Sequence, residues 1–335
     1  MASRRALAAG LIPALFWFSA VSTAEARQLS FYRDSTSLHY LWQVDSGNKA
    51  DLTLTLPTES ALPAWQAWRS DQANAFVIQQ LMANAKEQFP DVMFSYRKTS
   101  DGGQVDYQTP DAEKYAAVGK WLPEQQDTLF KTYLDQHYFK LAETPSGQAI
   151  RPDHIRIATD ASEELTDIAQ TLKKTILENQ SAPVDDSKSI QKEMTRVAAG
   201  LLNFIQSIPY DSLSGTDANR RGLSFLMPLQ VLMQNRGDCD SKATLFLSLM
   251  RNLYPDLEQA IIYIPNHAFV ALNLSVDDPS QQTVTINNMP YLIFEVTGPA
   301  ELPPGQAGEQ SRFYITTGHY QYDLLQPTTT NSTPN

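Results

Sequence analysis

The chain has 335 residues, of which 42% are hydrophobic and 19% charged, and its formal net charge is −11. This composition is typical of a globular protein with room for one large domain or two modest ones. The excess of acidic side chains argues against nucleic acid or an anionic membrane surface as the main partner.

The N-terminus has the pattern of an export signal. Arg4 and Arg5 precede an apolar stretch over residues 6–21, and Ala24-Glu25-Ala26 fits a small-x-small cleavage site. We therefore expect residues 1–26 to be a signal peptide, with a retained anchor helix as the alternative. Removal of this segment would leave no membrane span and would place the protein in the periplasm or outside a bacterial cell.

Residues 27–148 are expected to form a smaller, mixed α/β N-terminal domain. Alternating apolar residues predict a hairpin over 27–60, and a second hairpin over 92–107. Helical spacing covers 65–88 and 110–141, the latter interrupted by a proline. No constellation with site chemistry is found in this part, so its role stays open.

Residues 149–325 are expected to form an α+β catalytic domain, followed by a disordered Thr/Ser/Asn/Pro tail over 326–335. A helix capped by Asp160 or Ser162 is expected first. The later elements expected in this domain are a helix over 187–208, a helix after Gly237, and strands over 259–264, 267–276 and 291–297.

The only cysteine of the chain, Cys239, lies where a glycine turn opens an apolar helix. Asp238 is a suitable N-cap, and Leu245 and Leu249 belong to the apolar stripe that buries this helix. A thiolate in the first turn is favoured by the positive end of the helix dipole. The pattern therefore predicts a nucleophile, against the alternative of an inert buried cysteine.

A base and a carboxylate follow on predicted strands. His267 opens an apolar strand, and alternation lets Glu295 on a later strand face it if the two strands pair antiparallel. A carboxylate there would orient the imidazole and stabilise its protonated form. Asp277 and Asp278 are rival acids, although they lie in a predicted turn.

Residues 150–325 resemble the transglutaminase-like superfamily of papain-like thiol enzymes. The motifs that carry the resemblance are Asn203-Phe204-Ile205-Gln206-Ser207-Ile208-Pro209-Tyr210, Pro228-Leu229-Gln230-Val231-Leu232, Arg236-Gly237-Asp238-Cys239-Asp240-Ser241-Lys242-Ala243, Asn266-His267-Ala268-Phe269-Val270 and Tyr291-Leu292-Ile293-Phe294-Glu295-Val296-Thr297. The resemblance implies a core of helices packed on an antiparallel sheet, with Cys239 as nucleophile, His267 as general base and acid, and Glu295 as third member.

Two departures from the family pattern concern this site. The chain has Glu295-Val296-Thr297 where aspartate followed by Pro-Thr is usual, and Phe269 where a tryptophan commonly follows the histidine. For the oxyanion of an acyl-transfer intermediate, the backbone N–H of Cys239 is the first candidate donor. Gln206 and Gln230 are the side-chain candidates.

The expected function is an exported cysteine hydrolase, of peptidase or amidase type, that works through a thioester. The alternatives are protein-glutamine acyl transfer, which shares every step up to the thioester, and a non-catalytic binding or scaffold protein. The expected partner is a protein or peptide substrate, for which the cell envelope is one source. The residues imply no cofactor and no metal, and they do not indicate an oligomeric state.

Overall fold

The structure of the chain is a computed structural model. It describes residues 27–44, 48–60, 62–99, 103–144, 147–179, 189–213, 225–276, 278–298 and 301–328. The expected signal peptide and the last seven residues of the expected tail lie outside this set. The described residues form a mixed α+β structure with eight helices and several antiparallel sheets, as the sequence indicates. None of these helices is both long and apolar enough to cross a bilayer.

The largest sheet has five antiparallel strands in the order β10-β11-β9-β8-β12. Its strands are β8 (Gln259–Ile264), β9 (His267–Leu272), β10 (Thr283–Ile286), β11 (Met289–Phe294) and β12 (Gln321–Leu325). The three central strands are apolar along most of their length because both faces of the sheet are covered. Val270 and Leu292 contribute to a core on the side of α7, whereas Phe269 and Ile293 pack with residues of α8 (Glu309–Thr317) on the other side.

Helix α7 (Cys239–Leu253) lies at the centre of the first of these cores. Every residue from Ser241 to Met250 is buried, which explains why the sequence is apolar around most of this helix. The helices that accompany it are α3 (His154–Glu164), α4 (Thr166–Asn179), α5 (Ser189–Ser207) and α6 (Pro228–Gln234). Cys239, the first residue of α7, is therefore mounted on a deeply buried helix.

A three-stranded sheet near the N-terminus packs on this same core. It consists of β1 (Gln28–Arg33), β2 (Ser37–Gln43) and β3 (Lys49–Thr55), and its inward side chains alternate as predicted. The Tyr40 hydroxyl donates to the carbonyl of Leu232 at 2.7 Å, and Trp42 Nε1 donates to Asn203 Oδ1 at 2.9 Å. The hydrophobic core thus crosses the boundary expected near residue 148.

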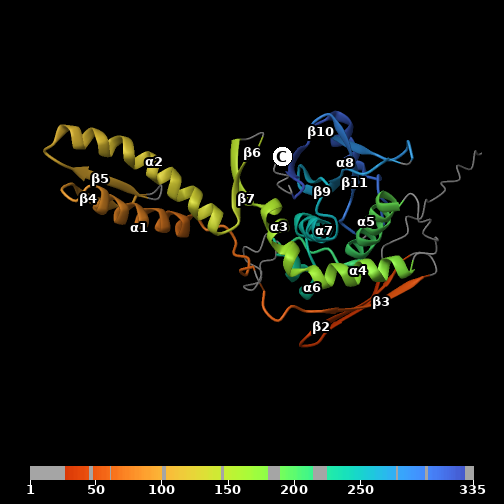
Figure 1. Cartoon of the computed structure of the whole chain (residues 1–335). Helices are drawn as coiled ribbons and strands as arrows, with labels where there is room; N and C mark the ends of the chain where they lie inside the picture. Colours follow the sequence, from red (N-terminus) through yellow and green to blue (C-terminus); the bar gives the residue numbers. More distant parts are fainter. Residues whose placement is uncertain are drawn as a thin grey trace, which may run out of the picture.

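The next segment projects from the body as an arm, clearly seen in Figure 1. The arm contains α1 (Ser70–Gln88), β4 (Met93–Arg97), β5 (Gln104–Gln108) and α2 (Ala112–Gln136). It has a small core of its own around Val77, Leu81 and Leu129. The hairpin β6 (Phe139–Thr144) and β7 (Gly147–Pro152) then leads back to the body at α3.

Several local expectations differ from the structure. Helix α1 begins at Ser70, not near residue 65, because Trp65 instead packs with Phe139 and Phe225. Residues 139–152 form a hairpin where a domain boundary was expected. Helix α3 begins before the expected caps, because the Asp153 carboxylate accepts from the backbone N–H of Arg156 at 3.4 Å.

Candidate active site

Cys239 is the first residue of α7, as predicted. Asp238 is the N-cap in extended conformation, and its carboxylate accepts from the backbone N–H of Ser241 at 3.2 Å. The N–H of the first helical residue has no carbonyl four residues earlier with which to bond inside the helix. The half-buried Cys239 lines a cleft of about 660 Å³, so its thiol and this N–H are at the positive end of the helix dipole beside a cavity.

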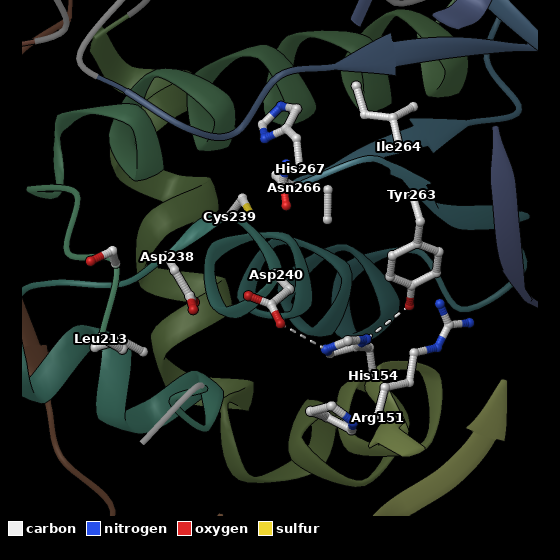
Figure 2. A pocket seen from close by; sticks show the side chains of 13 residues that line it. Arg151, His154, Leu213, Asp238, Cys239, Asp240, Tyr263, Ile264, Asn266 and His267 are labelled. Carbon is white, nitrogen blue, oxygen red and sulfur yellow. Dashed lines mark hydrogen bonds and ion pairs between the residues drawn. The ribbon is translucent and has the colours of Figure 1, made fainter. Parts of the chain in front are cut away.

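His267 is placed by a two-residue turn between β8 and β9. Ile264 and His267 pair across the turn, and Pro265 and Asn266 form its two central positions. Proline fixes its own φ near −65°, and Asn266 adopts the left-handed φ of 60°, the combination that a type II turn requires. Figure 2 shows His267 and Cys239 next to each other on the wall of the cleft.

Glu295 reaches His267 because β11 pairs antiparallel with β9. Phe294 is opposite Val270 in this pairing, so the chain beyond β11 continues toward the start of β9. His267 Nε2 and Glu295 Oε2 are 2.7 Å apart, and the Glu295 side chain is 4% exposed. The facing pair is the one predicted from strand alternation, although β10 is inserted between the expected turn and β11.

Asp278, one of the two rival acids, does not lie beside the imidazole. Asp278 lies in the exposed turn and its carboxylate accepts from the backbone N–H of Ser280 at 2.8 Å. Asp277 lies outside the described residues. Of the acids that the sequence offers, the structure brings Glu295 to His267.

The environment of His267 favours its charged form. Burial lowers the pKa of the imidazole, but hydrogen bonding to Cys239 and to Glu295, together with their negative charges, outweighs burial and raises the pKa to about 10. Because Glu295 holds Nε2, Nδ1 is the ring nitrogen left to face Cys239. At neutral pH the arrangement suits an imidazolium that lies between Cys239 and Glu295.

The two glutamines expected as oxyanion donors have other partners. Gln206 donates from Nε2 to the carbonyls of Glu295 at 2.7 Å and Leu302 at 2.9 Å, which uses both N–H groups of its amide. The Gln230 carbonyl accepts from the backbone N–H of Met227 at 3.1 Å and lines a different cavity. Gln206 therefore holds the backbone of Glu295 in place, and Gln230 caps α6.

A buried polar network beside the thiol was not foreseen. His154 is 2% exposed, and its Nε2 is 3.2 Å from Asp240 Oδ2 and its Nδ1 2.8 Å from the Tyr263 hydroxyl, as dashed lines in Figure 2 show. Tyr263 also donates to Asp323 at 3.1 Å. These residues come from α3, α7, β8 and β12, and no sequence spacing connects them.

Two further groups near Cys239 were missed as site residues. Burial, followed by the charge of Asp240, raises the pKa of Asp238 to about 8. Burial raises the pKa of Tyr210, and the negative charge of Cys239 raises it further. In the sequence, Tyr210 directly follows Pro209, the proline after α5, and this position could have drawn attention to it. The backbone of Tyr210 forms a β-bridge with Gly237.

Among the described residues, no group of three or more His, Cys, Asp or Glu side chains is arranged to hold a metal ion. Comparisons of the chain with family models, with curated proteins and with solved structures found no match.

Proposed function

We propose that the protein is an exported cysteine hydrolase of the transglutaminase-like type, which cleaves peptide or amide bonds in the periplasm or outside the cell. The observation that carries this proposal is the 2.7 Å pair of His267 Nε2 and Glu295 Oε2 beside Cys239 at the start of α7. Helices packed on an antiparallel sheet support the resemblance to that superfamily at the level of architecture.

In the acylation step, the Cys239 thiolate attacks the carbonyl carbon of the substrate and the electron pair of the C=O bond moves to oxygen. The backbone N–H of Cys239 and the Tyr210 hydroxyl are the proposed donors to this oxyanion. Collapse of the intermediate breaks the C–N bond, and His267 transfers its Nδ1 proton to the departing amine. A thioester and neutral His267 remain.

In the deacylation step, neutral His267 removes a proton from water, which attacks the thioester carbonyl. The C–S bond breaks, the acid leaves, and the thiolate–imidazolium pair is restored. Glu295 stabilises the imidazolium in the resting enzyme and keeps Nδ1 directed at the sulfur throughout. The positioning of Glu295 itself depends on the amide of Gln206.

The test is alkylation of Cys239 by iodoacetamide in the folded protein as a function of pH. We expect fast labelling at and below neutral pH for the wild type, and labelling of the His267→Ala variant only near pH 8.5, where an ordinary thiol ionises. His39→Ala is the matched control, because His39 lies on β2 and bonds to Asp34 and Thr53 instead.

Peptide hydrolysis is measured in parallel by mass spectrometry of the products. Cys239→Ser and His267→Ala should lose activity, and His39→Ala should keep it. Labelling of Cys239 only after unfolding, or equal labelling of wild type and His267→Ala at every pH, would contradict the proposal. Transfer of an added amine to the acyl group, in preference to water, would favour the acyl-transfer alternative.

A further inference from the structure

A second hollow adjoins the catalytic cleft. Its volume is about 830 Å³, and Ile264, Pro265, Phe313, Tyr314 and Tyr320 form its apolar walls. It shares Arg151, Tyr263 and Ile264 with the cleft that contains Cys239. The two hollows therefore share part of their walls.

The shared wall lies close to the general base. Ile264 and His267 are the outer residues of the turn between β8 and β9, and their Cα atoms are less than about 7 Å apart in such a turn. A ligand against Ile264 and Pro265 would thus be about one residue away from the reacting carbonyl.

The hollow offers apolar surface without a free charge among its described walls. Arg151 is the charged side chain there, and its guanidinium is 2.6 Å from Asp323 Oδ2 and stacks on the Tyr263 ring at 3.8 Å. Phe313 is 61% exposed although its neighbour Tyr314, whose ring centroid is 5.3 Å away, is partly buried. A large apolar side chain fits these walls better than a charged one.

Hydrogen bonds hold the backbone and one aromatic ring of these walls in place. Gln310 on α8 donates to the carbonyl of Pro265 at 3.0 Å, which ties the helix of Phe313 to the turn of His267. The Tyr320 hydroxyl accepts from the backbone N–H of Thr285 and donates to its carbonyl, both at 3.0 Å. A preformed apolar hollow binds a side chain with little cost of reorganisation.

We propose that this hollow is the specificity subsite of the enzyme, which binds a large apolar side chain, aromatic above all, of an extended peptide substrate held at Cys239. The inference rests on the proposed hydrolase function and names its substrate class. Phe313 is the residue that determines the preference.

The test uses heptapeptides of alanine and glycine in which one position at a time carries Phe, Ala or Lys. We expect Phe at one position to raise kcat/KM by about ten- to hundredfold over Ala, the range for burying such a side chain. Phe313→Ala should remove most of this preference, and Phe313→Leu should keep part of it. Tyr115→Ala, which changes a similarly exposed aromatic residue on α2, is the control and should leave the preference unchanged.

Binding of the same peptides to the Cys239→Ala variant, measured by calorimetry, separates the subsite from catalysis. Binding that favours Phe and depends on Phe313, without turnover by the wild type, would support the subsite and overturn the hydrolase. Turnover that ignores Phe, or a Phe preference that persists in Phe313→Ala, would overturn the subsite alone. Absence of both binding and turnover would overturn both.

Discussion

Among the single residues, Glu295 has the clearest effect on His267, because its carboxylate favours the protonated imidazole. The two side chains are 2.7 Å apart, and the carboxylate is almost fully enclosed. A charge of opposite sign at this distance and burial favours the imidazolium strongly. Burial lowers the pKa of His267, but hydrogen bonding to Cys239 and to Glu295, together with their charges, raises it to about 10.

Glu295→Gln should move the alkaline limb of activity to lower pH. Wild-type kcat/KM is expected to fall as the pH rises through about 10, because the imidazolium that protonates the leaving amine is lost there. The amide can still accept from Nε2 but carries no charge, so the pKa of His267 should fall by about one to three units. The measurement is the pH profile of kcat/KM for a hydrolysed peptide.

The control for this experiment is Glu258→Gln. Glu258 bonds to Asn273 and Tyr291, away from the imidazole, so its substitution should leave the alkaline limb in place. An unchanged limb in Glu295→Gln would show that this carboxylate does not stabilise the imidazolium.

At the scale of elements, Lys242 links α7 to α5. The Lys242 side chain is fully buried and its Nζ donates to the carbonyl of Ile208 at the end of α5. Burial lowers the pKa of this amine to about 7, and the charge of Asp238 opposes the shift. The helix that begins at Cys239 thus contains a buried amine whose pKa lies near neutral pH.

Lys242→Met should change how stability depends on pH. Between about pH 7 and the unfolded pKa near 10.5, the unfolded chain binds more protons, so this lysine makes the free energy of unfolding rise with pH. Removing it should raise Tm most at pH 6, and less at pH 10, where loss of the bond to Ile208 costs about 1 kcal/mol. Thermal unfolding at several pH values measures this.

Lys131→Met is the comparison, because Lys131 is exposed on α2 and pairs with Asp127. Its effect on Tm should be small and nearly independent of pH. A Lys242→Met effect of equal size at every pH would mean that the amine does not titrate in this window.

Elements with strong local signals were predictable, and contacts that depend on the whole fold were not. The strand 259–264 and the helix start at Cys239 follow from apolar runs next to a proline and a glycine, and the structure has the same bounds. The facing of His267 and Glu295 follows from period-two alternation. The partners of Gln206 do not, because a carbonyl 89 residues away competes for its amide and no local pattern reports this.

At the scale of the whole molecule, the N-terminal part of the chain belongs to two different structures. Strands β1–β3 add Leu38, Tyr40 and Trp42 to the core that surrounds α7, whereas the arm packs around Val77 and Leu129. Alternation along β2 reveals a buried face but not what covers it. For that reason the sequence predicts the strands of this sheet but not their packing on the core around α7.

The two parts should respond in opposite ways to deletion. Replacing residues 74–129 by a short Gly-Ser linker removes the arm's own core. A short linker can join the ends because Trp68 and Phe130, which both remain, have ring centroids 6.2 Å apart. Cooperative unfolding and the alkylation rate of Cys239 should persist.

Deleting residues 28–55 instead exposes the helix face beneath β2 and β3. This removes on the order of 10 kcal/mol of apolar burial, which is comparable to the net stability of a domain, so the protein should not fold. Circular dichroism melting and iodoacetamide labelling measure both outcomes, and loss of labelling in the variant without the arm would show that the site depends on the arm.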